Sequence, residues 1–371
     1  MYDFSKYQNV PIYMGRGCVP AHPEVFAAAG RRAMIVSGRH GADACGAFAD
    51  AAAVLEAAGC TFIRWAGVKE NPPAPDCHEA GRRAREEGCD FIVAIGGGSA
   101  LDAGKAVAGY AANPECGVMD LFDEGKRTAP CLPLIAIPTT AGTGSEACRY
   151  SVLTIEDGRR KKTFKDVSAY PRASFVDPRY TETLSDKYTV STALDALAHA
   201  MESYFSPKTV KASEEAALWA AREIWDVLFR KGKRTGWTPT DRERLAAAAA
   251  AAGIAIDYTG TGFPHPLGYC LTLTRGTPHG EACAVFEGAF LTYNMLTEKG
   301  RCRAELLADA VGSTPEEMIR RIPEASGISL RIPPEEREEL IDRVSGAGNF
   351  ANSMYVISRG EMSDIFARLF G

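Results

Sequence analysis

Short apolar runs alternate with segments of helical periodicity through the first half of the chain. Four of these runs predict buried strands, at residues 33–37, 61–65, 90–95 and 132–137. The segments between them predict helices, at residues 42–58, 78–87 and 99–112. Strands that alternate with helices form parallel sheets covered by helices on both faces. The first half therefore predicts an α/β fold around a parallel sheet.

The second half of the chain has a different sequence pattern: one helical segment follows another, and runs of β-branched residues are rare. A polar, basic hairpin is expected at 153–167, and one more strand at 173–176. The helices expected after it lie at 189–205, 213–230, 240–256, 281–297, 304–311, 315–322, 334–345 and 359–370. We therefore expect an α/β domain over 1–180 and an all-α domain over 181–371.

Length and composition are those of an ordinary globular protein. The 371 residues are enough for two domains, and 46% of them are hydrophobic and 24% charged. The formal net charge is -5. A negative balance argues against nucleic acid or an acidic membrane as a partner. The basic residues near Lys161 and Lys162 are assigned to the solvated hairpin.

The cysteines and the apolar runs bear on the cellular compartment. Eleven cysteines are spread singly along the chain without a CxxC pair, which is typical of reduced thiols. The first ten residues lack the basic and apolar regions of a signal peptide. The alanine-rich run at 246–256 is too short and too weakly apolar to span a bilayer. These features predict a cytoplasmic protein without a membrane partner.

A glycine-rich turn joins the third predicted strand to a helix. Gly96, Gly97, Gly98 and Ser99 follow the strand at 90–95 directly. Glycines let a backbone approach a bulky anion, and the helix N-terminus behind them offers free N–H groups to a pyrophosphate. A plainer interpretation is a capped helix in which Ser99 and Asp102 form a capping box. The two interpretations are compatible.

A second loop of small and hydroxyl residues follows the next strand. Residues 138–146 read PTTAGTGSE, and standing alone this segment would be interpreted as a turn-rich loop. Open parallel sheets bind ligands beyond the carboxyl ends of their strands, so two such loops together favour a dinucleotide site. The usual GxGxxG fingerprint is absent, because Cys18 follows Gly15-Arg16-Gly17 and the third glycine is missing.

The predicted helical domain holds a possible metal site. Asp195 and His199 are four residues apart, which places them on one face of a helix. His265 and His279 lie further along, and the chain has only six histidines. On spacing alone an accidental pair is the stronger interpretation, since D-x-x-x-H is common. Three imidazoles and one carboxylate suit iron, zinc or nickel.

Taken together, these segments resemble the iron-containing (group III) alcohol dehydrogenase family over nearly the whole chain. GGGSALDAGKAVA (96–108) and IPTTAGTGSEA (137–147) are similar to its two nucleotide segments. DALAHAMESY (195–204) and HPLGYCLTLTRGTPHG (265–280) are similar to its two metal motifs. The resemblance implies a dinucleotide-binding domain over 1–180, a helical metal-binding domain over 181–371 and an active site in the cleft between them, the dehydroquinate synthase-like architecture.

The resemblance also implies roles for individual residues. By analogy, one catalytic metal, usually Fe(II), is held by Asp195, His199, His265 and His279. The residues expected at the cofactor are Gly38, Asn71, Gly97, Gly98, Ser99, Asp102, Thr139, Thr140, Thr143, Leu153 and Lys161. A homodimer or larger assembly, acting on a small alcohol or aldehyde, is implied as well.

Two positions depart from the family pattern. Many members carry a histidine four residues after the third ligand as a proton relay, and here that position is Tyr269. A tyrosine with an ordinary pKa of about 10 is a different acid, so the alternative relay is cofactor ribose and water. NAD-preferring members often place an aspartate after the second strand, where this chain has Gly38, Arg39 and His40. We therefore expect NADP(H) to be favoured over NAD(H).

Several other functions compete with a metal-dependent, NAD(P)-linked alcohol dehydrogenase. A dehydroquinate synthase-like lyase shares the architecture and uses NAD with zinc, but would give no net change in nicotinamide absorbance. A glycerol dehydrogenase or a maleylacetate reductase-like enzyme is an alternative within the superfamily. A non-catalytic nucleotide- or metal-binding protein is disfavoured, because all four candidate ligands are present.

Overall fold

The computed structural model of the chain describes residues 2–7, 9–155, 160–230 and 235–371. By Cα packing it divides into two compact units, Met1–Ser185 with Trp237–Gly253 and Asp186–Gly236 with Ile254–Gly371. The division falls inside helix α8 (Pro239–Thr259), whose first part is counted with the first unit. The assignment of residues 1–180 and 181–371 as cofactor and metal domains stays a prediction.

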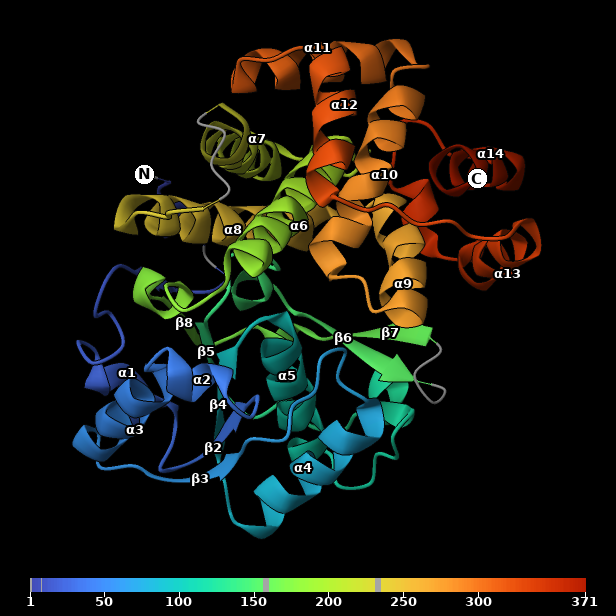
Figure 1. Cartoon of the computed structure of the whole chain (residues 1–371). Coiled ribbons are helices and arrows are strands. Elements are labelled where there is room, and N and C mark those ends of the chain that lie inside the picture. The colour runs from blue at the N-terminus through green and yellow to red at the C-terminus, as the bar shows by residue number, and fades with distance from the viewer. Residues whose placement is uncertain (1, 8, 156–159, 231–234) are drawn as a thin grey trace. The chain divides into compact units, whose positions relative to one another are not determined.

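A six-stranded parallel sheet forms the centre of the first unit, as the alternating pattern predicts (Figure 1). Its strands are β1 (Ile12–Met14), β2 (Arg32–Ser37), β3 (Thr61–Trp65), β4 (Phe91–Gly96), β5 (Leu134–Pro138) and β8 (Ala173–Val176). The spatial order is β1-β8-β5-β4-β2-β3, and every pairing is parallel. Strand β1 was not predicted, because three residues are too few to show a pattern.

Helices cover both faces of this sheet, and alternate strand residues face each layer. Met34, Ile92 and Leu134 pack with α4 (Ala74–Glu86) and α5 (Gly98–Ala112). On the other face the strands pack against α1 (Pro23–Ala29), α2 (Gly41–Ala44) and α3 (Ala47–Ala57). The expected helix at 42–58 is thus two helices, because Gly46 adopts a left-handed conformation with φ +83° between them.

The predicted basic hairpin is present as an antiparallel pair, β6 (Tyr150–Ile155) and β7 (Arg160–Lys165). Its expected turn, residues 156–159, lies outside the described residues. Leu153 and Phe164 are fully buried in the same core cluster as α4 and α5. The hairpin is therefore anchored to one face of the first unit by its apolar side chains, while the basic side chains of β7 other than Lys161 are exposed.

The second unit is helical, as predicted. Besides the end of α8 it comprises α6 (Asp186–Tyr204), α7 (Lys211–Trp225), a π-helical turn (Asp226–Arg230), α9 (Pro264–Arg275), α10 (His279–Asn294), α11 (Glu298–Val311), α12 (Pro315–Ser326), α13 (Pro334–Val344) and α14 (Arg359–Phe370). Helix α9 was not predicted, because Pro264, Pro266 and Gly268 suggest a loop. Proline is nevertheless favourable in the first turn of a helix, where its missing N–H costs nothing. Within the described residues, no helix is both long and apolar enough to cross a membrane.

The order of the strands determines where a ligand would bind to the first unit. From β2 the chain moves outward to β3, and it then returns to the other side of β2 for β4 and β5. This is a topological switch point, and open α/β sheets bind ligands beyond the carboxyl ends of the strands there. In the register of the sheet, Ser37 lies beside Ile95 and Gly96 beside Pro138. The loops that follow β2, β4 and β5 therefore begin side by side at the same edge of the sheet.

Candidate metal centre and nucleotide site

The glycine-rich turn and the threonine loop of the first unit fit together closely. A Cβ atom on Gly97 would lie 3.0 Å from Cγ2 of Thr140, and one on Gly98 would lie 2.5 Å from Cγ2 of Thr143. Gly96 has φ +148°, which side chains rarely allow. The glycines thus admit two threonines beside the N-terminus of the 15-residue helix α5. Both threonines are half-buried.

This arrangement presents N–H and hydroxyl groups, the donor set that suits a phosphate group. The predicted cofactor residues Gly97, Gly98, Ser99, Thr140 and Thr143 are brought together by it, and each is half-buried.

Asp102 has a different role from the capping residue that the sequence suggested. Helix α5 begins at Gly98, its N-cap residue is Gly97, and no side chain caps it. Instead, Oδ1 of Asp102 accepts a hydrogen bond from the Ser145 hydroxyl at 2.5 Å, and Oδ2 accepts one from the Val152 N–H at 2.9 Å. Asp102 therefore joins α5 to the threonine loop and to β6, and the predicted capping box is wrong. Its predicted contact with the pyrophosphate stays a prediction.

A fully buried lysine completes this network. Nζ of Lys105 donates to Oγ of Ser145, to the Ser145 carbonyl and to the Tyr150 carbonyl, each at 2.7 Å. Oδ1 of Asp102 lies 3.9 Å from the same nitrogen. A buried ammonium group is tolerated only when such acceptors surround it. Lys105 thereby fixes the end of the threonine loop against α5.

Asn71 links the start of α5 to β6. Its N–H donates to Oγ of Ser99 at 3.3 Å, and its carbonyl accepts from Oγ1 of Thr154 at 2.8 Å. Its φ is +53°, a left-handed conformation that asparagine tolerates better than most residues. The predicted cofactor residue Asn71 thus lies beside the predicted residue Ser99.

The remaining predicted cofactor residues lie in different surroundings. Thr139 is buried, and its N–H donates to the Gly96 carbonyl at 2.9 Å. Gly38 is half-buried at the end of β2, and Lys161 is half-buried on β7 opposite Thr154. The Leu153 side chain is fully buried in the core. The structure gives Leu153 a packing role, and its cofactor contact stays a prediction.

In the second unit, four predicted metal ligands converge. Asp195 and His199 lie one turn apart on α6, His265 is the second residue of α9, and His279 is the first residue of α10. Oδ1 of Asp195 lies 4.0 Å from Nε2 of His199, 3.9 Å from Nε2 of His265 and 3.7 Å from Nε2 of His279. These residues, up to 84 positions apart (from 195 to 279), therefore surround one carboxylate oxygen.

The spacing of these atoms fits a metal ion. The distances are too long for hydrogen bonds, and among the described residues the buried Oδ1 of Asp195 accepts none. Two ligands of one tetrahedral metal lie roughly 3.3–3.6 Å apart at bond lengths of about 2.0–2.2 Å. A buried carboxylate oxygen facing three imidazole nitrogens at nearly this spacing is the donor set of a divalent transition metal.

A buried glutamate orients one of the imidazoles. Oε1 of Glu202 lies 2.6 Å from Nδ1 of His265, and Oε2 accepts the Gly262 N–H at 2.5 Å. A carboxylate beside Nδ1 keeps the proton on that nitrogen and directs the lone pair of Nε2 toward the metal position. Burial and the charge of Glu202 raise the pKa of the buried Glu287 well above its ordinary value. Glu287 therefore favours its protonated form, so it adds no second negative charge beside Glu202.

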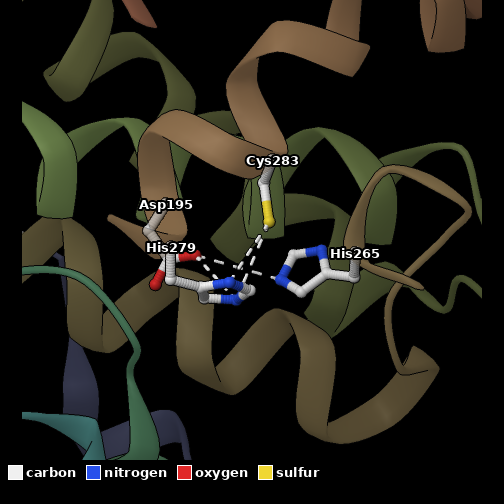
Figure 2. A group of neighbouring side chains, drawn as sticks. All are labelled: Asp195, His265, His279 and Cys283. Atoms are coloured by element: carbon white, nitrogen blue, oxygen red, sulfur yellow. Dashed lines mark hydrogen bonds and ion pairs between the residues drawn. The ribbon is translucent and has the colours of Figure 1, made fainter. Parts of the chain in front are cut away.

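Figure 2 shows a further group in this cluster, Cys283, whose sulfur points toward His279 and His265. The ligand atoms of Asp195, His265, His279 and Cys283 all lie within 4.8 Å of one another. Tyr269 is close by, with its ring stacked on that of His279 at 5.4 Å between centroids. Sequence reasoning placed Tyr269 here but missed Cys283 and Glu202.

A close helix crossing brings His279 to Asp195. A Cβ atom on Gly280 would lie 1.8 Å from the Ser191 carbonyl oxygen and 2.9 Å from the Asp195 nitrogen. Only glycine permits α10 to begin this close to α6, and the residue before it is His279. The position of the His279 imidazole thus depends on the neighbouring residue, Gly280, having no side chain.

Comparison with known proteins identifies the family. The family model for iron-containing alcohol dehydrogenase matches residues 9–178, and the model for the C-terminal part of the Fe-containing alcohol dehydrogenase family matches residues 189–326. The chain belongs to the iron-containing alcohol dehydrogenase family. It is 30% identical to the lactaldehyde reductase of Escherichia coli K12 over 341 residues, which cover 89% of this chain and 87% of that protein. Membership confirms the resemblance predicted from the motifs.

Other relatives support the same assignment. A probable alcohol dehydrogenase, EutG, of Salmonella typhimurium is 32% identical over 66% of this chain, but the match spans only 61% of that relative's length. The crystal structure of an iron-containing alcohol dehydrogenase from Thermotoga maritima is 29% identical, with a TM-score of 0.89 and full coverage of both chains. This structural similarity confirms the predicted fold, an N-terminal α/β part followed by a helical C-terminal part.

Replacing Gly280 tests whether the helix crossing positions the metal site. In Gly280→Ala the new methyl group would collide with the Ser191 carbonyl, so α10 must move away from α6. We expect the variant to bind cobalt(II) at least about tenfold more weakly, as measured by calorimetric titration. Gly360→Ala is the matched control, because Gly360 is the second residue of α14 and meets only Oγ of Ser358, at 4.0 Å. Equal cobalt affinity in both variants would contradict this role of Gly280.

The raised pKa of the buried Glu146 side chain should make the stability of the protein depend on pH. Burial raises the pKa of Glu146 from 4.5 to about 7, although the Lys105 ammonium lowers it. The native state therefore holds a proton that the unfolded chain releases, and the free energy of unfolding falls as pH rises from 4.5 to about 7. The fall from this group is about 3 kcal/mol.

Calorimetric unfolding between pH 4.5 and 7.5 measures this effect. Glu146→Gln cannot ionise, so we expect its stability to decline less over this pH range than that of the wild type. Glu56→Gln makes the same charge change at an exposed position of α3 and serves as the control. Parallel curves for the wild type and Glu146→Gln would show that Glu146 does not titrate in this range.

Proposed function

We propose that this enzyme is a metal-dependent, NAD(P)-linked alcohol dehydrogenase or aldehyde reductase. The observation that carries the proposal is the buried carboxylate oxygen of Asp195, which faces Nε2 of three histidines at 3.7–4.0 Å. Family membership supports the reaction class. Asp195, His199, His265 and His279 would hold Fe(II), with zinc or nickel as alternatives. Bound there, the metal supplies Lewis-acid polarisation of a carbonyl, and the nicotinamide supplies the hydride.

Neighbouring side chains position the proposed metal ligands and the proposed cofactor loop for this reaction. Glu202 holds the proton of His265 on Nδ1, so Nε2 remains a ligand. Asp102, Ser145 and Lys105 fix the threonine loop, so Thr140 and Thr143 stay beside the glycine-rich turn. The predicted cofactor contacts at Gly97, Gly98, Ser99 and Asp102 are proposed on this basis.

Tyr269 is proposed as the proton donor for the alcohol oxygen. Its ring stacks on His279 at 5.4 Å and meets His265 edge-on at 6.4 Å between centroids. The phenol hydroxyl is a donor and an acceptor, so it can pass a proton in either direction. The alternative is a relay through cofactor ribose and water, and Tyr269→Phe separates the two because it removes the hydroxyl and keeps the stacked ring.

We propose small alcohols and aldehydes as substrates. Relatives include a lactaldehyde reductase and 1,3-propanediol dehydrogenases, whose names show such substrates for those proteins. We further propose that the protein is cytoplasmic and forms a homodimer or larger assembly. The lyase alternative is disfavoured, because the family models that match the chain are those of alcohol dehydrogenases.

NADP(H) is proposed as the preferred cofactor. Beyond β2, at the switch point of the sheet, the chain continues with Gly38, Arg39 and His40, and the last two are exposed. The nearby carboxylate of Asp43 is engaged by Arg64 at 2.5 and 2.8 Å. A cation without a competing carboxylate favours the 2′-phosphate of NADP(H) over the bare ribose of NAD(H).

The reaction class is tested anaerobically with Fe(II)-loaded enzyme. We expect NADPH absorbance to fall only when both the metal and an aldehyde or ketone are present. His279→Ala removes one ligand, so its metal affinity should fall at least about 100-fold while the fold is retained. His22→Ala removes a histidine of the first unit, at the N-cap of α1, and should keep both metal and turnover. Full metal content in His279→Ala, by elemental analysis, would refute the ligand assignment, and no net absorbance change on any carbonyl would favour the lyase.

Cofactor preference is tested by kcat/KM for NADPH and NADH. A charge-assisted hydrogen bond from Arg39 to a 2′-phosphate is worth about 1.5–3 kcal/mol. Arg39→Ala should therefore lower kcat/KM for NADPH roughly tenfold or more and leave the value for NADH unchanged. Arg31→Ala removes an exposed arginine just before the other end of β2 and should change neither value. A strong preference of the wild type for NADH would refute the proposal.

A further inference from the structure

An ion pair lies beside the carboxyl end of β2, where the exposed Arg39 follows the strand. Arg64 is the fourth residue of β3, and its guanidinium reaches Asp43 of α2. Nη1 donates to Oδ1 at 2.8 Å and Nη2 donates to Oδ2 at 2.5 Å, so one planar group engages both carboxylate oxygens. A pairing through two hydrogen bonds fixes the orientation of a carboxylate as well as its distance.

The same guanidinium is also bound to the end of β2. Nε and Nη2 of Arg64 donate to Oγ of the buried Ser37 at 3.3 and 3.2 Å, and this hydroxyl donates to the Gly38 carbonyl at 3.1 Å. Cζ of Arg64 lies 3.8 Å from the centre of the Phe48 ring, which is a cation–π contact. These contacts fix the Arg64 side chain, so Asp43 is held near the turn that begins at Gly38.

We propose that Arg64 determines the cofactor specificity by masking Asp43, which would otherwise bind the adenosine ribose of NAD(H). The proposal rests on the proposed function, because it concerns the same cofactor and its proposed preference. In open α/β sheets a carboxylate near the second strand binds the 2′-hydroxyl of NAD(H), and a nearby arginine accommodates the 2′-phosphate of NADP(H). This chain has both kinds of group at that position, and they are paired with each other.

The pairing changes what Asp43 offers to a cofactor. Its side chain is 46% exposed, so without Arg64 the carboxylate would present a full negative charge to an incoming ligand. The hydrogen bonds from Arg64 lower the pKa of Asp43, which keeps the pair ionised at neutral pH. The two charges of the pair then cancel, and the exposed Arg39 leaves the turn with an excess of positive charge. That balance favours a 2′-phosphate.

Asp43 is the acidic residue best placed to oppose a 2′-phosphate. In the described structure, α2 and α3 carry two further carboxylates, Asp50 and Glu56. Asp50 accepts hydrogen bonds from Nη2 of Arg179 at 2.9 Å and from the Tyr180 hydroxyl at 2.7 Å. Glu56 lies in the last turn of α3, whereas Asp43 lies in the first helix after β2. Masking this single carboxylate is therefore enough to change the charge beside the turn.

Titration of the nicotinamide fluorescence of NADPH and NADH measures the effect without turnover. The two cofactors differ only in the 2′-phosphate, so the ratio of their dissociation constants reports on this position, whereas a general structural defect would weaken both. The full-length wild type is compared with Arg64→Met, Asp43→Asn and the double variant. Methionine removes the charge and keeps an apolar contact with Phe48. Arg32→Met is the matched control, because it breaks an ion pair with Glu87, of 3.0 Å, at the other end of β2.

We expect the wild type to bind NADPH more tightly than NADH. Arg64→Met should lower this preference at least about tenfold, because the unmasked carboxylate repels the 2′-phosphate and accepts a hydrogen bond from the 2′-hydroxyl. The double variant should keep the wild-type preference within about threefold, since it has no carboxylate to unmask. Asp43→Asn should prefer NADPH at least as strongly as the wild type, and Arg32→Met should not change the preference.

An unchanged preference in Arg64→Met, or an equal loss in the double variant, would overturn the role of Arg64 and leave the proposed function intact. A wild type that binds NADH more tightly would overturn the proposed preference for NADP(H) as well. Binding of neither cofactor by the wild type would overturn the proposed dinucleotide-linked function itself. If Arg64→Met does not fold, Arg64→Lys keeps the charge but loses the two-bond pairing, so it should lower the preference. An unchanged preference in that variant would also overturn the proposal.

Discussion

The buried carboxylate of Asp195 is the group on which the arrangement of the second unit depends. Removing a carboxylate from water costs several kcal/mol or more unless an opposite charge or hydrogen bonds replace the water. Here the neighbours of Oδ1 are imidazole nitrogens at 3.7–4.0 Å, too far to donate to it. Glu202 holds the proton of His265 on its far nitrogen, so that ring offers a lone pair rather than a charge. A cation at this position would satisfy Oδ1 of Asp195 and the facing imidazole nitrogens, and the close crossing at Gly280 keeps these groups near one another.

The first unit contains a buried group of the opposite charge. The Lys105 ammonium group there is surrounded by hydrogen-bond acceptors of the chain itself. Lys105 donates to three acceptors at 2.7 Å, and Asp102 accepts from Ser145 and Val152. Two motifs that are separate in sequence are therefore one hydrogen-bonded structure. Gly97, Gly98, Thr140 and Thr143 lie outside this network and are half-buried, which fits the proposed cofactor contacts. Asp102 is used for the network and does not cap the helix.

Much of this could be predicted from periodicity and local spacing. The parallel sheet and most helices follow from patterns of two and 3.6 residues, and Asp195 and His199 lie on one face of α6 as their spacing predicts. Helix α9 was missed because its first residues, Pro264 and Pro266, suppress the helical pattern locally. Glu202 could not be assigned, since its partner is 63 residues away and only tertiary packing joins them. Cys283 did leave a signal, the four-residue spacing from His279, but cysteine alone is too often a core residue for that spacing to decide.

The same electrostatic reasoning bears on what a metal bound at this position could do. With Asp195 as its one carboxylate ligand and neutral imidazoles as the others, a divalent ion would keep one excess positive charge. That remaining charge would polarise a carbonyl oxygen, the chemistry that the proposed reaction requires. The protonated form favoured by Glu287 fits this balance, since a further carboxylate charge beside Glu202 would repel the electrons that move toward the carbonyl oxygen during reduction.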